Sequence, residues 1–591
     1  MNRFRLLAHS LWNSKWSQLA ARLKLTVKRT GLVAFHGVGI GPGAWYWRGA
    51  AQIRYPVTVS GSILTHEQEN QNLPLNVDLV GTPWTVHEGM DWNPSELNRG
   101  THLEKLNLHY MLYLLKLRPQ AAVQLMEDWA LRVPPYLPAY WKDTWNSYSL
   151  SIRVTVWMDL LTTLPDAIES KSLRVINQSL AAQIRFLTGN METDIGGNHL
   201  MKNIRALLRA GAYFMGSEAD RWTSLAFKFL NHQLKEQILP DGMHFELSPS
   251  YHLQIFEDLL DIRRAVVIAA LRTRCKIGLQ AQVILHNLDN SLIKMGIVAQ
   301  RMTHPDGMPS LFADGGLHMT ASSKALLKKL IDLKVIKSKN MLDTTGPWRL
   351  QDAGYVGLSS ENGLLVVDCG PVGARHLPAH GHGDALAIEW SILGRRVIVD
   401  SGVCEYHSGP RRAYSRSTAA HNTVTVNNVD QSEFWSAFRV GRRAHVAMEV
   451  WQPLKEGFNF QASHDGYRRL KGHPIHRRTI MASPKCIKVT DEVIGGAQQP
   501  VQSRLLLAPT ARIKNITHAP TGGSRVLIVV DKHPEDLHCS DSLQLELLSS
   551  APIRSESAQW SPDFGVLKDT LMIIIEVGCA PCSATWSIEV T

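Results

Sequence analysis

The chain has 591 residues, of which 44% are hydrophobic and 19% are charged. These fractions exclude an intrinsically disordered chain, and the length favours more than one domain. Basic residues exceed acidic residues by 11, which favours an anionic partner such as nucleic acid, acidic polysaccharide or a membrane surface. No uninterrupted apolar run of about 18 residues occurs, so no transmembrane helix is expected. The seven cysteines are scattered and odd in number, which argues against a disulfide scaffold.

Residues 1–66 form a basic N-terminal segment with nine Lys and Arg residues, and Glu67 is the first acidic residue. The first 30 residues have the basic start of a secretory signal but lack a long apolar core and a clear cleavage site. We therefore expect the segment to be retained and the protein to be cytoplasmic. We also hypothesise that the segment docks to an acidic partner or to a membrane surface. The remaining 525 residues carry a net charge of only +2.

Residues 67–340 are predicted to form a helical domain, because apolar residues recur at helical spacing from about residue 100. One stripe consists of Leu106, Tyr110, Leu114 and Leu117, a second of Ile204, Leu207, Leu208 and Gly211, and a third of Phe256, Leu259 and Leu260. The segments 239–251 and 304–316 contain turn residues and are predicted to be loops.

Residues 350–591 are predicted to form a β domain, because the apolar period changes to two. The expected strands are 363–370, 385–392, 396–402, 421–428, 478–483, 488–493, 503–509, 525–531, 543–548, 571–577 and 585–590. Many short strands joined by turns are typical of an antiparallel sandwich. The fold class is therefore α+β, with a helical domain followed by an antiparallel β-sandwich domain.

Nucleic-acid and nucleotide binding lack their usual motifs. No zinc-finger spacing, basic region with heptads, P-loop or dinucleotide fingerprint occurs, so no nucleic-acid partner is expected. Cys579 and Cys582 form a single CxxC motif without the strand-helix context of a redox domain, which favours incidental cysteines over a redox or metal site.

Histidines gather at the start of the β domain, between residues 376 and 426. Antiparallel strands would bring His382, Asp400 and His421 together, and these side chains suit Zn²⁺. The alternative is that the histidines bind backbone groups in loops and that Asp400 caps a turn. Spacing alone favours this alternative, because ligands far apart in sequence cannot be established from spacing.

Four segments, 196–214, 239–262, 379–402 and 411–444, resemble the heparinase II/III family of polysaccharide lyases in their order along the chain. The resemblance implies an incomplete α/α toroid packed on an antiparallel β-sandwich. It also implies a lyase that cleaves an anionic, uronic-acid-containing polysaccharide or oligosaccharide by β-elimination.

The resemblance implies roles for individual residues. Asn198 and His199 would donate to the uronate carboxylate, although Asn198 alone also fits a helix N-cap. Tyr251 matches the family's catalytic tyrosine, and nearby cations would favour its phenolate. His380 would bind the carboxylate or assist proton transfer. Tyr414 would protonate the leaving oxygen, as in alginate-type relatives.

Further residues complete this predicted site. Arg411, Arg412 and Arg416 are plausible anion contacts, because guanidinium groups bind carboxylates and sulfates in bidentate geometry. His244 and His252 are weaker candidates, with a structural or a substrate-lining role. His382, Asp400 and His421 match the family's zinc ligands, and we assign this Zn²⁺ a structural role. Lys202 departs from the family pattern, in which acidic residues are frequent at this position.

Two other functions remain compatible with the sequence. A uronyl C5-epimerase of exopolysaccharide synthesis shares the proton abstraction, and a non-catalytic polysaccharide-binding protein would keep the fold. The family resemblance also favours the cell envelope or periplasm as an alternative location. The sequence does not specify the sugar, the linkage or the oligomeric state.

Overall fold

The computed structural model describes residues 6, 14–37, 71–92, 102–135, 140–163, 170–271, 276–338, 344–520, 522–531 and 542–591. Most of the basic segment 1–66 therefore lies outside the described residues. The chain divides into two compact units. The helical unit contains residues 15–236 and 258–290, and the sheet unit contains residues 1–14, 237–257 and 291–591. The domain boundaries expected from the sequence, at residues 66, 340 and 350, stay predictions.

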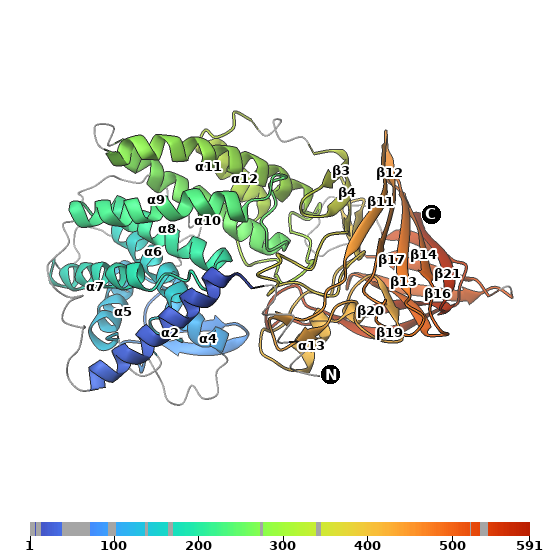
Figure 1. The fold of residues 1–591 in the computed structure, drawn as a ribbon, viewed down its shortest axis with the longest axis horizontal. Helices are drawn as coiled ribbons and strands as arrows, with labels where there is room; N and C mark the ends of the chain where they lie inside the picture. Colours follow the sequence, from blue (N-terminus) through green and yellow to red (C-terminus); the bar gives the residue numbers. More distant parts are fainter. Residues whose placement is uncertain are drawn as a thin grey trace. The chain divides into compact units, whose positions relative to one another are not determined.

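The helical unit is built mainly from helices that follow one another along the chain (Figure 1). Its elements are α2 (Trp16–Gly37), β1 (Leu75–Leu79), β2 (Thr82–Val86), α4 (His102–Tyr110), η2 (Leu112–Lys116), α5 (Pro119–Arg132), α6 (Ser147–Thr163), α7 (Ser170–Gly189), α8 (Gly197–Tyr213) and α9 (Ser217–Gln237). Helices α10 (Pro249–Ala270) and α11 (Lys276–Arg301) contribute residues to both units. Helix α6 packs against α4, α7 and α8. The toroidal arrangement of the helices stays a prediction. Among the described helices, none is long and apolar enough to cross a membrane.

Tryptophans and one arginine fill the centre of the helical unit. Trp129, Trp145 and Trp157 are fully buried and their rings pack together. The guanidinium of Arg153 lies 3.9 Å from the centre of the Trp129 ring and donates to Gln183 Oε1 at 2.9 Å. Burial lowers the pKa of Arg153 to about 9. This cation is stable in the core because an aromatic face and hydrogen-bond acceptors replace its water.

The predicted helical stripes on α8 and α10 are confirmed, but the stripe from Leu106 to Leu117 does not lie on one helix. Helix α4 ends at Tyr110, and Met111 adopts a left-handed conformation with φ 56° before the short helix η2. A left-handed residue interrupts the i to i−4 hydrogen bonds, so the apolar period continues while the helix does not.

Charged residues on α8 pair with acidic residues on α10 and α6. The cations are Lys202, Arg205 and Arg209, and the anions are Asp258, Asp261 and Asp159. Lys202 Nζ donates to Asp258 Oδ1 at 2.8 Å, and both side chains are buried. The unusual lysine in the 196–214 segment therefore has a structural explanation, because it neutralises a buried carboxylate on the neighbouring helix.

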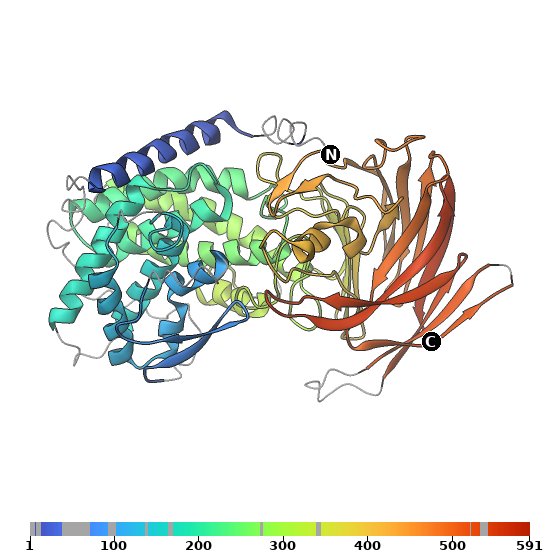
Figure 2. The same ribbon diagram turned by 90° about the horizontal axis from the view of Figure 1, so that it is seen from below.

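The sheet unit contains three larger antiparallel sheets (Figures 1 and 2). The five-stranded sheet consists of β3 (Gly346–Leu350), β4 (Tyr355–Ser360), β5 (Gly363–Asp368), β6 (Ile388–Ile392) and β7 (Arg395–Ile398). The four-stranded sheet has the order β19 (Ile553–Trp560), β20 (Lys568–Cys579), β15 (Pro500–Leu506) and β8 (Val424–Val426). The eight-stranded sheet has the order β11 (Val446–Leu454), β12 (Gly457–His464), β13 (Ile475–Ala482), β14 (Cys486–Ile494), β21 (Cys582–Val590), β18 (Leu543–Ser549), β17 (Ser524–Val530) and β16 (Ala511–His518).

Shorter elements complete this unit: helices α12 (Ser323–Asp332) and α13 (Pro410–Arg416), the 3₁₀ turn η4 (Thr418–Ala420), and the pair β9 (Phe434–Trp435) and β10 (Arg439–Val440). Strands β11, β12, β16 and β19 lie outside the strands expected from the sequence. The apolar alternation is interrupted in β19 (IRSESAQW), so its period-two signal is weak, whereas β12 (GFNFQASH) alternates and was missed.

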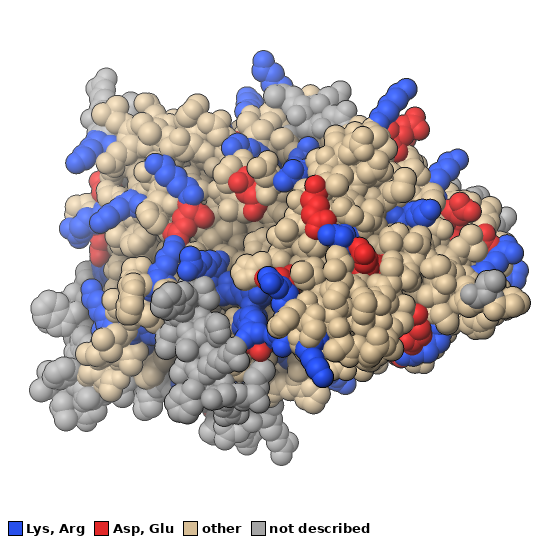
Figure 3. Space-filling model, turned by 45° about the vertical axis from the view of Figure 1, so that its right-hand side comes forward, with Lys and Arg blue, Asp and Glu red and all other residues tan. Residues whose placement is uncertain are grey.

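One apolar core joins the three sheets, and the predicted antiparallel β-sandwich is confirmed. Residues from all three sheets, such as Val367, Val501 and Phe460, belong to the same buried cluster. Ile398, at the end of β7, pairs with Leu507, which extends β15, so the five- and four-stranded sheets meet at this point. Burial alternates along β13 and β14, as expected for strands with one face on the core. On the face drawn in Figure 3, basic and acidic side chains are interspersed.

A buried ion pair connects the eight-stranded sheet to the segment before β6 and to the segment before β8. Arg478 on β13 binds both carboxylate oxygens of Asp491 on β14, at 2.7 and 2.9 Å. The same guanidinium donates to the carbonyl oxygens of Leu386 at 2.6 Å and Asn422 at 2.7 Å. Arg478 and Asp491 have no exposed surface. The pair therefore fixes the positions of two loops that carry histidines.

We predict that Arg478→Leu destabilises the protein by about 3–5 kcal/mol, because it leaves the Asp491 carboxylate buried without its cation. Urea unfolding followed by circular dichroism measures this loss. The matched control is Arg512→Leu on β16, whose ion pair with Asp531 is exposed, and its cost should stay within about 0.5 kcal/mol. Equal losses in the two variants would contradict the prediction.

Candidate active site

Tyr251 lies in the first turn of α10, in a part of the helix that belongs to the sheet unit. Ser248 Oγ accepts a hydrogen bond from the Tyr251 backbone N–H at 3.2 Å and donates to the carbonyl oxygen of Asp314 at 2.5 Å. Ser250 Oγ donates to the carbonyl oxygen of Gly316 at 3.1 Å. Two serines of the SPSY sequence therefore attach the start of α10 to the 314–316 loop.

The Tyr251 side chain contacts a histidine and a second tyrosine. Its ring stacks on His380 with a centroid distance of 4.0 Å and an angle of 26°. Its hydroxyl lies 3.0 Å from the hydroxyl of Tyr406. Burial raises the pKa of Tyr251 well above its usual value, and Tyr406 and Asp314 raise it further. The resting side chain is therefore a neutral phenol, in contrast to the expectation that nearby cations favour the phenolate.

Asp314 connects the charged groups around Tyr251. Its carboxylate is fully buried and accepts hydrogen bonds from His380 Nδ1 at 2.9 Å and His382 Nε2 at 2.8 Å. Arg412 binds both of its oxygens, with Nη2 at 2.8 Å from Oδ2. Burial opposes ionisation, but the charge of Arg412 and the hydrogen bonds from both histidines hold the pKa of Asp314 well below its usual range. Asp314 is therefore ionised at neutral pH.

The contact with Asp314 determines how His380 can act. A hydrogen bond to a carboxylate fixes Nδ1 as the donor nitrogen, so Nε2 is left as the nitrogen that can accept a proton. Nε2 lies 3.7 Å from Glu246 Oε2, which is beyond hydrogen-bond distance, and 12% of the side chain is exposed. His380 therefore has the arrangement of an oriented general base.

Aromatic rings surround this group. Tyr406 contacts Phe438 and Phe564 at centroid distances of 5.3 and 4.6 Å, and Arg412 lies 5.0 Å from the Tyr406 ring. Phe438 is 40% exposed although its ring lies 6.4 Å from that of His380. An exposed aromatic ring beside buried polar groups offers an apolar face on which a ring-shaped ligand can stack.

Sequence reasoning missed Asp314 and Tyr406. Asp314 lies in the loop 304–316, which turn residues identify only as a loop, and Tyr406 lies in an irregular segment between β7 and α13. No local spacing distinguishes these residues from other loop residues. Their positions depend on contacts with residues 66 to 155 positions away in the chain.

Tyr414, Arg411 and Arg412 differ in burial and in the groups around them. Tyr414 is 44% exposed, and the charged groups that influence its pKa are Arg504, Glu556 and Asp400. Tyr406 therefore replaces Tyr414 as the tyrosine next to Tyr251. Arg411 is exposed on α13, whereas Arg412 is buried against Asp314.

Two predicted substrate contacts, Arg416 and His244, are buried. Arg416 is 1% exposed and donates to the carbonyl oxygens of Gly381 and Ala437, at 3.0 and 3.1 Å. His244 is fully buried and its Nε2 lies 2.9 Å from Gln237 Oε1. Burial lowers the pKa of His244 well below its usual value. Both side chains hold protein groups, so neither is placed to contact a polymer.

A candidate metal centre lies beside this cluster. The ligand atoms of His382, Asp384 and His421 lie within 4.8 Å of one another, and all three residues are buried. His382 Nδ1 and His421 Nε2 have no hydrogen-bond partner among the described residues. Asp400, the expected carboxylate ligand, instead accepts a hydrogen bond from the other ring nitrogen of His421, with Nδ1 to Oδ2 at 2.7 Å.

The surroundings of these histidines fit a cation. Asp368, Asp384 and Asp400 are all buried around His421. Burial raises the pKa of Asp368 well above its usual value, and the charge of Asp384 raises it further. Two bare imidazole nitrogens and a carboxylate form a donor set that suits Zn²⁺, and Asp400 is placed to orient His421 from behind.

Asn198 and His199 lie in the helical unit, at the start of α8. The N-cap of α8 is Gly196, with φ 75°, and Gly197 also has a positive φ of 54°. The interpretation of Asn198 as the N-cap is therefore wrong. Two consecutive glycines allow the left-handed turn that brings Asn198 into the first turn of the helix, where it is 4% exposed.

His199 is held by a carboxylate and an aromatic ring. Its Nδ1 lies 3.0 Å from Glu192 Oε1, and its ring lies 4.4 Å from that of Tyr148 on α6. Asn203 donates to Glu192 Oε2 at 3.1 Å and accepts from the Glu192 backbone N–H at 2.8 Å. Glu192 therefore orients His199 in the way that Asp314 orients His380, although the sequence analysis did not identify Glu192.

Three residues near these groups have left-handed backbone conformations without being glycine. They are Leu247, Ala313 and Leu386, with φ of 59°, 61° and 63°. Leu247 directly precedes the segment Ser248 to Tyr251, Ala313 directly precedes Asp314, and Leu386 follows Asp384 by two residues. Such conformations cost about 1–3 kcal/mol each and persist where surrounding contacts enforce them, often at functional sites.

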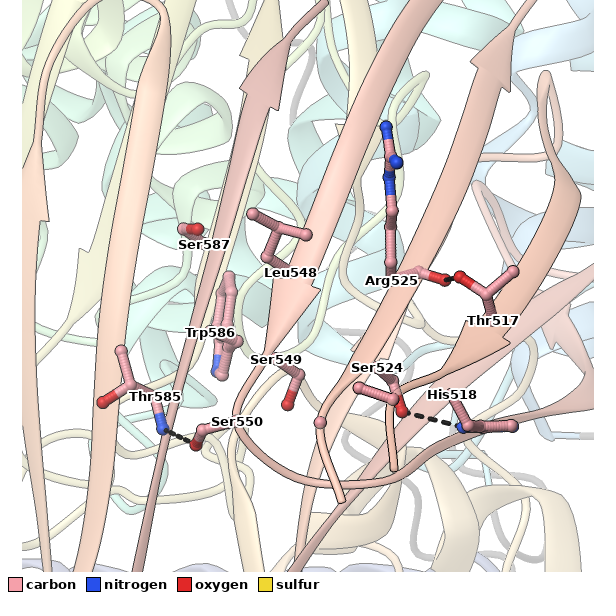
Figure 4. A pocket seen from close by; sticks show the side chains of 12 residues that line it. Thr517, His518, Ser524, Arg525, Leu548, Ser549, Ser550, Thr585, Trp586 and Ser587 are labelled. Atoms are coloured by element: carbon pink, nitrogen blue, oxygen red, sulfur yellow. Dashed lines mark hydrogen bonds between the residues drawn. The ribbon is translucent and has the colours of Figure 1, made fainter. Parts of the chain in front are cut away.

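A pocket on the eight-stranded sheet lies apart from all of these residues (Figure 4). Its lining includes Ser524, Ser549, Ser550, Thr585 and Trp586. The hydroxyls already bind protein groups: Ser550 accepts from the Thr585 backbone N–H at 3.0 Å and Ser524 lies 2.9 Å from His518 Nδ1. The pocket contains none of the predicted catalytic side chains.

Comparisons with known proteins agree with this arrangement. Residues 84–334 match the family model described as heparinase II/III N-terminus, and residues 343–579 match heparinase II/III-like, C-terminal. A heparin-sulfate lyase from Bacteroides stercoris is 26% identical over 51% of this chain and 44% of its own length. Another, from Bacteroides thetaiotaomicron, is 21% identical over 64% of this chain and 56% of its own length. The chain therefore aligns with about half the length of these curated relatives.

Solved structures share the fold. A crystal structure of heparinase III has a TM-score of 0.67 at 16% identity, covering 95% of this chain and 91% of that chain. A heparan sulfate lyase from Pedobacter heparinus has a TM-score of 0.55 at 17% identity, covering 86% and 79% of the two chains. At these identities the structural likeness supports the helical and β-sandwich architecture.

Buried His252 gives a prediction for the pH dependence of stability. His252 Nε2 donates to the carbonyl oxygen of Met295 at 3.0 Å, and Nδ1 accepts from the His244 backbone N–H at 3.2 Å. Burial lowers the pKa of His252 to about 4. Below about pH 6.5 the unfolded chain binds a proton that the folded chain rejects, so stability falls as the pH is lowered towards 4.

We predict that the stability of wild type relative to His252→Gln decreases by about 3 kcal/mol between pH 7 and pH 4, because glutamine supplies a donor and an acceptor without titrating. Urea unfolding of both proteins across this pH range measures the difference. A difference that stays constant with pH would show that His252 is not a buried neutral imidazole.

Proposed function

Because the chain belongs to the heparinase II/III family, we propose that it is a lyase that cleaves a uronic-acid-containing glycosaminoglycan by β-elimination. The observation that carries this proposal is the group formed by Tyr251, His380, Asp314 and Tyr406. The names of the relatives, heparin-sulfate lyases, support a sulfated glycosaminoglycan such as heparan sulfate as the substrate.

The reaction sets clear chemical requirements. A base removes the C5 proton of the uronate, the C4–O bond breaks, and an acid protonates the departing glycosidic oxygen. The products are a shortened chain and a 4,5-unsaturated uronate. The C5 proton is weakly acidic because its removal places further negative charge on the carboxylate, so this carboxylate needs positioned donors.

His380 and Tyr251 meet the requirements for base and acid. His380 Nε2 is the acceptor nitrogen of an imidazole whose other nitrogen is held by Asp314, so it takes the C5 proton. Tyr251 is a neutral phenol at rest and gives its proton to the leaving oxygen. The hydroxyl of Tyr406, 3.0 Å away, donates to the resulting phenolate and assists its reprotonation.

Asn198 and His199 are the proposed donors to the uronate carboxylate. An amide donor does not compete for the C5 proton, and His199 is oriented by Glu192. The exposed guanidinium of Arg411 is the proposed contact for an outer carboxylate or sulfate.

His382 and His421 are the proposed histidine ligands of a structural Zn²⁺, and the geometry favours Asp384 over Asp400 as the carboxylate ligand. The ion would supply positive charge that holds two chain segments together, one with His382 and Asp384 and the other with His421. The protein's own contribution is orientation, because His382 binds Asp314 through Nε2, and the same carboxylate orients His380.

Two alternatives differ in outcome. A C5-epimerase would return a proton to C5 without breaking the C4–O bond, and a binding protein would leave the polymer unchanged. The paired tyrosines favour elimination, because a neutral phenol is available for the leaving oxygen. The lyase relatives also favour elimination over these alternatives.

We predict that the protein releases unsaturated uronate from heparan sulfate, measured by ultraviolet absorbance, and that Tyr251→Phe lowers kcat/KM by about 10²- to 10⁴-fold. Phenylalanine keeps the stacking on His380 and removes only the proton. Tyr406→Phe should lower kcat in the same direction by a smaller factor, because it removes the partner of the phenolate.

Tyr414→Phe is the matched control, since it removes a phenol from the same segment without touching Tyr251, and its kcat/KM should remain close to that of wild type. Deuterium uptake at C5 without cleavage would replace the proposal with epimerisation. If the protein binds members of a panel of glycosaminoglycans and bacterial exopolysaccharides but catalyses neither reaction, it is a polysaccharide-binding protein.

We predict that the purified protein contains about one equivalent of zinc and that Asp384→Asn removes it. Asp400→Asn should weaken zinc binding by about 10- to 100-fold, as expected for a carboxylate that orients a histidine ligand. Elemental analysis and chelator competition measure both effects. If Asp400→Asn abolishes binding while Asp384→Asn retains it, Asp400 is the carboxylate ligand; wild type without zinc would refute the metal site.

A further inference from the structure

Helix α2 presents an apolar stripe to solvent. Trp16, Leu23 and Val27 are 86%, 67% and 64% exposed, and together with exposed Ala20 they recur at the i, i+4, i+7, i+11 spacing of one helix face. Leu25, on the opposite face, is 7% exposed. A helix on a soluble domain normally turns its apolar face towards the core, so this arrangement is reversed.

Polar contacts hold the other side of α2 against the helical unit. Lys15 forms an ion pair with Glu236, and Gln18 Nε2 donates to the carbonyl oxygen of Ile195 at 3.1 Å. Lys28 Nζ donates to the carbonyl oxygen of Gly189 at 2.6 Å. These contacts use the face that carries Leu25, so they determine that the apolar stripe faces outward. Figure 2 shows α2, in dark blue, at the edge of the helical unit.

Exposed Lys24 borders the stripe on one side. On the other side, Lys15 and Arg22 pair with Glu236 and Asp194 but keep 43% and 56% of their side chains exposed. No acidic residue occurs in α2, or anywhere before Glu67. The exposed face therefore combines an apolar centre containing a tryptophan with cationic edges.

We propose that the exposed face of α2 is a docking surface for an anionic lipid bilayer. In such an interface the apolar side chains enter the boundary between headgroups and acyl chains, and the flanking cations meet the lipid phosphates. Tryptophan is well suited to this depth because its ring is apolar and its N–H is polar. The charge complementarity selects an anionic surface over a neutral one.

A polysaccharide polyanion is a less suitable occupant of the same face. It would pair with the cations but leave Trp16, Leu23 and Val27 in water, because sulfated chains offer no apolar surface to bury them. The inference is independent of the proposed lyase activity, since vesicle binding is measured without substrate.

The test is co-sedimentation of the full-length protein with phosphatidylcholine vesicles, with and without phosphatidylglycerol. We expect binding only to vesicles that contain phosphatidylglycerol, weakened by high salt. The triple variant Trp16→Ser, Leu23→Ser, Val27→Ser should bind at least about tenfold more weakly, and Lys24→Gln about fivefold more weakly. The changed side chains are exposed, so the circular dichroism spectrum and melting temperature should match those of wild type.

The matched control is Leu279→Ser, Val283→Ser on α11, which removes two side chains that are 60% and 66% exposed in the same unit. This control should bind vesicles like wild type. Unchanged binding in the triple variant, or no binding by wild type, would overturn the proposal. A wild-type dimer in sedimentation velocity that becomes monomeric in the triple variant would assign the face to a second copy of the chain instead.

Discussion

The buried carboxylate of Asp314 determines the arrangement of the candidate site residues in the sheet unit. It is the common partner of His380, His382 and Arg412, so it links the proposed base, a proposed metal ligand and a cation in one contact group. An isolated buried carboxylate would be unstable in a protein interior, and this one is tolerated because three donors surround it. The hydrogen bond to the buried Asp314 carboxylate therefore fixes the orientation of the His380 ring, which stacks on Tyr251.

Buried polar side chains of the β-sandwich hold the chain segments that carry the histidines of this group. Arg478 binds the carbonyl oxygens of Leu386 and Asn422, and the Asn422 side chain donates to the carbonyl oxygens of Ile388 and Val399, both at 2.8 Å. These hydrogen bonds satisfy backbone carbonyl oxygens in and next to the strands from which the histidine loops extend. The sheets are thus more than a scaffold of apolar layers, because they also fix the loops through buried polar groups.

The sequence predicted the architecture better than the site. Helical and strand periods are local signals, so the order of helices and then strands was recoverable, and the family resemblance identified Tyr251 and His380, which lie together in the structure. Asp314 and Tyr406 were not recoverable, because their roles arise from long-range contacts in irregular segments. Burial also cannot be read from composition: Arg416 looks like an anion contact in the sequence, but it binds carbonyl oxygens in the interior.

The left-handed conformations of Leu247, Ala313 and Leu386 have a consequence for the precision of the site. At each position glycine would adopt the same backbone without steric cost, but at Leu247 and Leu386 it would also remove a side chain that packs in a hydrophobic core. Glycine would also widen the range of conformations open to the segments that carry Tyr251, Asp314 and Asp384. The side chains at these three positions therefore offset the strain of the left-handed backbone with core packing at Leu247 and Leu386, and all three narrow the distribution of side-chain positions at the site.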